Sequence, residues 1–153
     1  MEKIHNLTNA FQRGSVAGAV DSIKTKMHLP GKVATSILTG VIGSLLITLF
    51  LTTFLHSHET VTFLPWIIAF NTAVTGYALI TKTGNQIKHK KISSLGAGTL
   101  NVLLTHVVLS FLFLYSEGEY LLGIWDLLFY LIIGIICSEL GTLLAIKYLK
   151  TKK

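Results

Sequence analysis

The lysines and arginines of this chain are gathered in three stretches, which pairs of long apolar runs separate. The thirteen Lys and Arg residues fall within 3–32, 82–91 and 147–153. The two remaining connections, 56–60 and 116–119, carry no Lys or Arg and hold three of the seven acidic residues. Cytoplasmic loops of membrane proteins are enriched in Lys and Arg. The pattern therefore predicts a membrane protein whose termini and central loop lie on the cytoplasmic side.

The apolar runs are long enough to cross a bilayer as helices, which takes about 20 residues each. The predicted spans are 33–55, 61–81, 92–114 and 121–148. Charged residues make up 13% of the chain, whereas a soluble domain carries about a quarter. The expected fold class is an all-α integral membrane protein, a four-transmembrane-helix bundle with N-in/C-in topology. Its Ile-, Leu- and Lys-rich composition fits a bacterial inner (cytoplasmic) membrane.

The segments outside the spans complete the expected domain organisation. Apolar residues at helical spacing among lysines predict an amphipathic interfacial helix within 1–32. Pro30 and Gly31 are expected to break this helix and turn the chain into the membrane. The membrane domain covers 33–148, and 149–153 is a basic cytoplasmic tail.

The two predicted hairpins resemble each other at an offset of 58 residues, which can reflect a repeat or the small alphabet of apolar helices. The matching pairs are Ser36 and Ser94, Gly40 and Gly98, Thr52 and Ser110, Glu59 and Glu117, and Gly76 and Gly134.

A stripe of small residues at four-residue spacing marks one face of the first span. It consists of Ser36, Gly40, Ser44, Thr48 and Thr52. Small residues let a second backbone approach closely, and hydroxyl groups can bond across such a contact. The stripe therefore predicts a helix-packing face, which serves either another span of this chain or a second subunit.

Three ionisable residues, His106, Asp126 and Glu139, lie within the predicted spans. Charges at a span centre cost at least about 2.5–3.5 kcal/mol, so such residues are candidates for function. Helix rise places His106 about 12 Å, and Asp126 about 7 Å, below the outer ends of their spans. These depths allow a hydrogen bond between them if the third and fourth spans pack together, which the tight connecting loop favours. The two residues are then a structural pair, or a proton relay or pH sensor; alternatively, Asp126 reaches the lipid headgroups. Glu139 is either a neutral, hydrogen-bonded side chain or an ion or proton site.

Two amides, Asn71 and Asn101, fall near the membrane midplane of the second and third spans. They predict an amide bridge between these spans or the lining of a polar path.

The outer trio His56, His58 and Glu59 is a weak candidate metal site, because two imidazoles and a carboxylate suit Zn or Cu.

The central basic loop predicts contact with anionic lipid headgroups through Lys88, Lys90 and Lys91.

No aromatic face accompanies the net charge of +6, so nucleic acid is not an expected partner. No phosphate-binding, metalloprotease or nucleophile motif is present, and no cofactor is expected.

The sequence thus favours a small non-enzymatic membrane protein that associates through its spans, as a homo-oligomer or as a subunit of a membrane complex. The alternative is a small channel or transporter for protons or small ions that uses Asn71, Asn101, His106, Asp126 and Glu139. A membrane enzyme acting on lipid is the third possibility.

Overall fold

The computed structural model describes residues 29–84, 87 and 89–151. The chain divides into two units, Met1–Gly31 and Lys32–Lys153, and nearly all of the described residues belong to the second unit. The predicted interfacial helix falls largely on residues 1–28, which lie outside the described residues.

The described residues form long helices, and no strand occurs among them. The unlabelled first helix is Leu29–Thr52, followed by α2 (Ser57–Thr83), α3 (Lys90–Glu117) and α4 (Ile124–Thr151). All four are long and apolar enough to cross a membrane, which confirms the predicted all-helical class and number of spans.

The helix ends differ from the predicted spans at two places. Pro30 and Gly31, which were expected to separate the interfacial helix from the first span, are helical in the structure, and the residues that precede Leu29 lie outside the described part of the chain. Pro30 falls in the first turn of the described helix, where a proline is tolerated. The fourth helix begins at Ile124 rather than at residue 121, because Asp126 caps it: its Oδ2 atom accepts a hydrogen bond from the Gly123 N–H at 2.8 Å.

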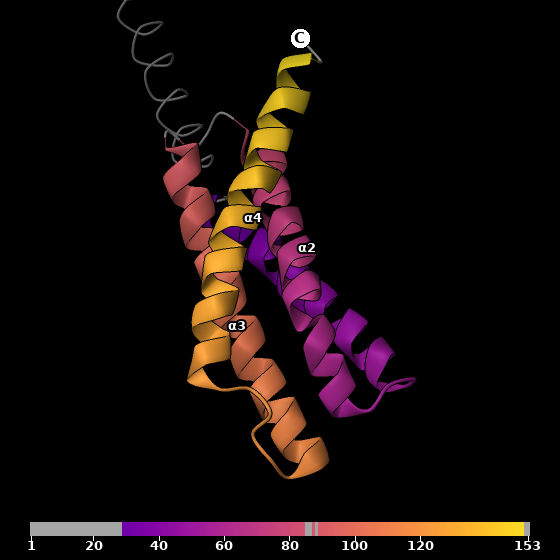
Figure 1. Cartoon of the computed structure of the whole chain (residues 1–153). Helices are drawn as coiled ribbons and strands as arrows, with labels where there is room; N and C mark the ends of the chain where they lie inside the picture. The colour runs from indigo at the N-terminus through magenta and orange to yellow at the C-terminus, as the bar shows by residue number, and fades with distance from the viewer. Residues whose placement is uncertain (1–28, 85–86, 88, 152–153) are drawn as a thin grey trace, which may run out of the picture. The chain divides into compact units, whose positions relative to one another are not determined.

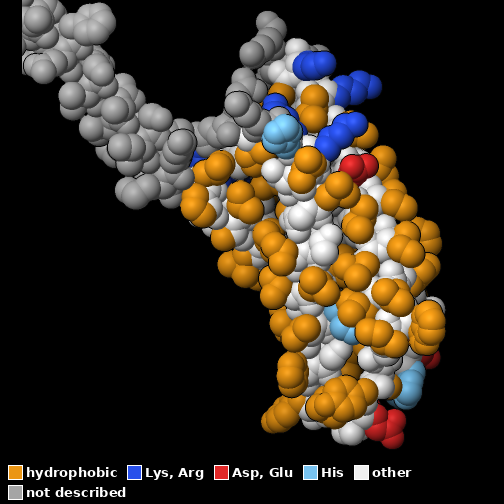
Figure 2. Space-filling model, turned by 90° about the vertical axis from the view of Figure 1, so that its left-hand side faces the viewer, with side chains coloured by type: hydrophobic (Ala, Val, Ile, Leu, Met, Phe, Trp, Pro, Cys, Tyr) orange, Lys and Arg blue, Asp and Glu red, His pale blue; other side chains and the backbone are white. Residues whose placement is uncertain are grey.

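Short connections make sequential helices antiparallel (Figure 1). The starts of the first helix and of α3 therefore lie at the same end as the C-terminal ends of α2 and α4. On the face that Figure 2 shows, Lys side chains gather at this end, which we call the lysine end. The opposite end, with connections 53–56 and 118–123, is called the acidic end. Of the labelled helices, α2 and α4 share the most extensive contact, and they run parallel.

The core differs between the two ends of the bundle. Toward the acidic end, large apolar side chains of α2, α3, α4 and the 118–123 connection pack together, and they form what we call the apolar cluster. Its buried members are Leu64, Ile67, Ile68, Val102, Leu109, Phe113, Leu122 and Tyr130. Toward the lysine end, the buried side chains are mostly small and many carry hydroxyl groups. This polar interior contains several of the predicted site residues.

Candidate functional site

The two predicted midplane amides are buried and linked through a threonine. Asn101 donates from Nδ2 to Thr75 Oγ1 at 2.5 Å, and Thr75 in turn donates to the main-chain carbonyl of Asn71 at 2.9 Å. The amide of Asn71 donates to the Ile67 carbonyl of its own helix at 2.9 Å. The expected amide bridge is therefore wrong, because the Asn101 amide bonds to Thr75 and the Asn71 amide bonds to the Ile67 carbonyl. Together with Thr105, which donates to Asn101 Oδ1, these residues form what we call the amide cluster.

A second polar group, the hydroxyl cluster, joins α3 to α4. Ser94 and Ser138 exchange bonds between hydroxyl and carbonyl groups at 2.9–3.0 Å. Thr142 donates to Ser94 Oγ at 2.7 Å and to the Gly76 carbonyl at 3.3 Å. These side chains are almost fully buried. Their donors and acceptors satisfy one another, which is the usual state of buried polar groups.

Glycines make these contacts possible by letting helices approach through their backbones. A Cβ atom added at Gly76 would overlap the Ser138 carbonyl, and one at Gly141 would overlap the Ala73 carbonyl. Gly40 of the first helix lies against Thr75, Asn101 and the Asn71 carbonyl in the same way. Four helices therefore meet around hydroxyl and amide groups with no room for larger side chains at these positions.

The small-residue stripe of the first helix faces this interior. Ser36, Ser44 and Thr48 are buried with at most 1% exposure, and Gly40 is buried as well. Thr52, near the acidic end, is half-buried and bonds to the Leu49 carbonyl. The stripe thus packs within the chain, so it supplies no free face for a second subunit.

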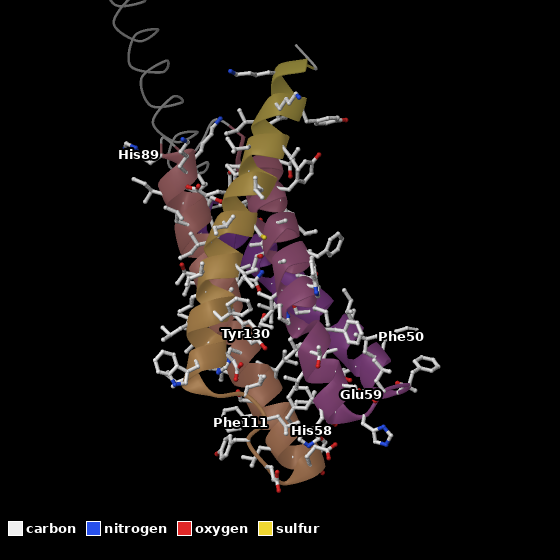
Figure 3. The ribbon with its side chains drawn as sticks, viewed as in Figure 1. Phe50, His58, Glu59, His89, Phe111 and Tyr130 are labelled. Carbon is white, nitrogen blue, oxygen red and sulfur yellow. The ribbon has the colours of Figure 1, made fainter. Side chains whose placement is uncertain are left out.

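The predicted bond between His106 and Asp126 does not form, because Asp126 caps α4 at Gly123. The Nδ1 atom of His106 is buried and has no hydrogen-bond partner in the described part of the chain. The His106 ring instead meets Tyr130 edge-on, with ring centroids 6.3 Å apart. Tyr130, which Figure 3 labels on α4, is thus a neighbour of His106 that the sequence did not indicate.

Glu139 lies half-buried on α4, beside side chains that point away from the bundle. Ile132, Ile136 and Leu143 share its side of the helix and are 60%, 55% and 50% exposed. No hydrogen bond or ion pair joins Glu139 to another described residue. Helix geometry places it about 12 Å from Lys147, too far for a direct contact. A carboxyl group therefore lies at the edge of an exposed apolar surface without a partner among the described residues.

The acidic end holds an open groove of about 410 Å³ between the 53–58 segment and the end of α3. The Ser57 hydroxyl bonds to the Glu117 carboxylate across it, tying the first hairpin to the second. Glu59 accepts a hydrogen bond from the His56 N–H at 3.3 Å and helps to cap α2. His58 also lines the groove. The described residues include no group of three side chains that could hold a metal, so the weak metal candidate is not supported.

Of the predicted headgroup ligands, Lys88 lies outside the described residues. Lys90 and Lys91 open α3 at the lysine end, where Lys91 is exposed. Their contact with lipid headgroups stays a prediction.

Sequence reasoning missed Thr75, Tyr130, Ser138 and Thr142 as partners of the predicted residues. Gly134, Ser138 and Thr142 repeat the four-residue spacing of the first-helix stripe, so the same argument could have found the face of α4 that packs inward. The role of Tyr130 had no comparable signal, because an aromatic residue in a span is ordinarily packed or interfacial.

No protein-family model matches the chain, and neither a curated protein nor a solved structure is detectably similar to it.

Proposed function

We propose that this chain is a non-enzymatic membrane protein that associates through its spans, and that α4 provides the associating surface. The observation that carries the proposal is the carboxyl group of Glu139, which is half-buried beside exposed aliphatic side chains and has no partner among the described residues. An unpaired polar group in lipid is unfavourable, and a hydrogen bond between spans contributes about 1–2 kcal/mol in model peptides. A donor from a neighbouring span would remove that cost.

The inward packing of the first-helix stripe is the reason that we propose α4, and not the first helix, as the associating surface. Because Ser36, Gly40, Ser44 and Thr48 are already covered within the chain, they do not serve a second subunit. The partner is either a second copy of this chain or another membrane protein. We further propose that the lysine end faces the cytoplasm of a bacterial cell and contacts anionic headgroups there.

Cysteine crosslinking in native membranes tests which surface associates. In a Cys137→Ser background, single cysteines at Ile136 and Leu143 should crosslink to the partner. Single cysteines at Leu46 and Phe70, exposed at 62% and 63% on the first helix and α2, serve as matched controls and should not. A strict monomer in both membranes and mild detergent, with no co-purifying chain, would contradict the proposal.

Substitution of Glu139 tests the role of its carboxyl group. Glu139→Ala should weaken association about five- to thirtyfold, the equivalent of about 1–2 kcal/mol. Glu139→Gln, which keeps the hydrogen-bonding capacity, should weaken it less. Glu119→Ala changes an exposed carboxylate at the acidic end and should leave association unchanged. Equal association in all three variants would remove Glu139 from the interface.

A small channel or transporter is the second candidate, and the unpartnered Nδ1 of His106 favours it. Proton flux in proteoliposomes separates the two functions. A transporter should lose flux on Asp126→Asn or Glu139→Gln, whereas an assembly protein should show no flux in its wild-type form.

A further inference from the structure

We propose that the groove at the acidic end binds the headgroup of a membrane lipid that carries both a phosphate and a primary ammonium group. Residues 52–58 and Glu117 line the groove, and its volume of about 410 Å³ falls within the range of small-molecule sites, about 300–1,000 Å³. It lies where helices long enough to cross a membrane end, which is the level of lipid headgroups. None of the lining residues belongs to α4, so binding here does not depend on association through Glu139.

One part of the groove favours a cation. Glu117 is the last residue of α3, where the helix dipole is negative, and no basic residue occurs in that last turn. Lys and Arg are absent from 33–81 and from 92–146, so no Lys or Arg of the described residues neutralises this carboxylate. It accepts a hydrogen bond from the Ser57 hydroxyl, and a carboxylate has lone pairs for further donors. An ammonium group would supply both the missing charge and the donors.

The neighbouring part of the groove suits a phosphate. The helix α2 begins at Ser57, and the first N–H groups of a helix lack an intrahelical acceptor. Ser57 and His58 supply two such N–H groups beside the groove, whereas Glu59 caps the preceding N–H of His56. The beginning of a helix favours a phosphate through these donors and its dipole. The imidazole of His58 can donate one more hydrogen bond.

The two parts adjoin each other, and this adjacency selects the headgroup. Ser57 begins α2, and its side chain bonds to Glu117. An ethanolamine phosphate carries its two charges on either side of two methylene groups, so it can reach both parts at once. The quaternary ammonium of a choline headgroup has no N–H to donate to Glu117, and a glycerol headgroup has no cation. A primary ammonium therefore gains a charge-assisted hydrogen bond that the other two headgroups lack.

An apolar row beside the groove favours a lipid over a free phosphate compound. Phe54 lines the groove and is 71% exposed, and its ring packs edge-on against Phe50 with centroids 5.1 Å apart. Phe50 lies at the same end of the bundle as His58 (Figure 3). Leu46 and Phe50, 62% and 63% exposed, precede Phe54 at four-residue spacing on the first helix. The acyl chains of a lipid would lie along this row while its headgroup occupies the groove.

Native mass spectrometry of the full chain in detergent micelles tests the choice of headgroup. The chain is offered phosphatidylethanolamine, phosphatidylcholine and phosphatidylglycerol in equal amounts and with identical acyl chains. Phosphatidylethanolamine should be preferred about two- to fivefold, the effect of one exposed ion pair. Glu117→Gln removes the charge and keeps an acceptor for Ser57, and it should abolish this preference. Glu119→Gln changes an exposed carboxylate that does not line the groove, and it should retain the preference.

Hydrogen exchange of the wild-type chain in nanodiscs is a second measurement, which needs no variant. The N–H groups of Ser57 and His58 should exchange more slowly in phosphatidylethanolamine than in phosphatidylcholine, whose net charge is the same. The first turn of α3, at the lysine end, should exchange equally in both lipids.

Three results would overturn the proposal. The first is a wild-type chain that does not prefer phosphatidylethanolamine, and the second is a preference that survives in Glu117→Gln. The third is equal protection of Ser57 and His58 by free phosphoethanolamine added to phosphatidylcholine nanodiscs, which would assign the groove to a soluble compound instead of a lipid.

Discussion

The lysine half and the acidic half of the bundle hold their helices together by different contacts. In the lysine half, Gly76 and Gly141 let α2 and α4 touch through their backbones, and the hydroxyl cluster of Ser94, Ser138 and Thr142 links α3 to α4. In the acidic half, the apolar cluster fills the space between helices with large side chains.

The difference matters because lipid tails are as apolar as a protein core. Helices in a membrane gain little from moving apolar side chains out of lipid, so close packing and hydrogen bonds must supply the preference for one arrangement. The lysine half has both contributions. The acidic half relies on packing between larger side chains, and it also contains the unsatisfied His106 and the open groove. We therefore expect the acidic half to be the part that adapts to a ligand or a proton.

The strongest test of the comparison adds bulk at a backbone contact of the lysine half. Gly141→Val should destabilise the bundle by about 3 kcal/mol or more, because the new side chain would overlap the Ala73 carbonyl, which cannot move without its helix. Thermal unfolding in detergent, followed by circular dichroism, measures the effect. Gly96→Val is the matched control: no atom lies within 4 Å of its added Cβ, and its melting temperature should change little. Equal losses in both variants would show that helix propensity dominates over the α2–α4 contact.

The second test removes bulk from the acidic half. Leu109→Ala should lower the free energy of unfolding by about 1–2 kcal/mol, less than in a soluble core. The substitution loses packing contacts, but the Leu109 side chain is buried from lipid and not from water, so no hydrophobic transfer energy is lost. Leu109 is fully buried in the apolar cluster. Leu144→Ala, at a position 63% exposed on α4, should be close to neutral. Reversible unfolding in mixed micelles compares the two, and a loss as large as that of Gly141→Val would contradict the proposed difference between the halves.

A third test separates hydrogen bonding from packing in the lysine half. Ser94→Ala should lower the free energy of unfolding by about 1 kcal/mol, because it removes hydrogen bonds between helices, to Ser138 and to Thr142. Thr81→Val is the control, since its hydroxyl is exposed and bonds only to its own helix. A double-mutant cycle with Thr142→Val should show coupling between the two positions. Additive losses would mean that the hydroxyl groups act independently.

Much of the fold could be predicted from charge and hydropathy, since a bilayer strongly restricts helix length and topology. The stripe around Gly40 also predicted a packing face, but its partner required three dimensions. The amide bridge was wrong because Thr75, one turn from Asn71, reaches Asn101 first. The expected pairing of His106 with Asp126 did not take into account a donor three residues away, the main-chain N–H of Gly123, which bonds to the Asp126 carboxylate. Depth along a helix can be estimated from sequence, whereas the choice among nearby hydrogen-bond partners depends on rotation about the helix axis.

The smallest expected effect concerns the contact between hairpins at the acidic end. Ser57→Ala removes the hydroxyl that bonds to Glu117 across the groove. Exposed bonds of this kind contribute less than about 1 kcal/mol, so global stability should change little. Local opening should nevertheless increase, because the beginning of α2 and the end of α3 share no other hydrogen bond among the described residues. Hydrogen exchange should therefore quicken in the first turn of α2 and the last turn of α3, while Ser116→Ala, whose hydroxyl bonds within α3, leaves the exchange in α2 unchanged. Unaltered exchange in Ser57→Ala would show that apolar packing alone holds the acidic end closed. The acidic half would then be as resistant to local opening as the lysine half, and the proposed difference between them would not hold.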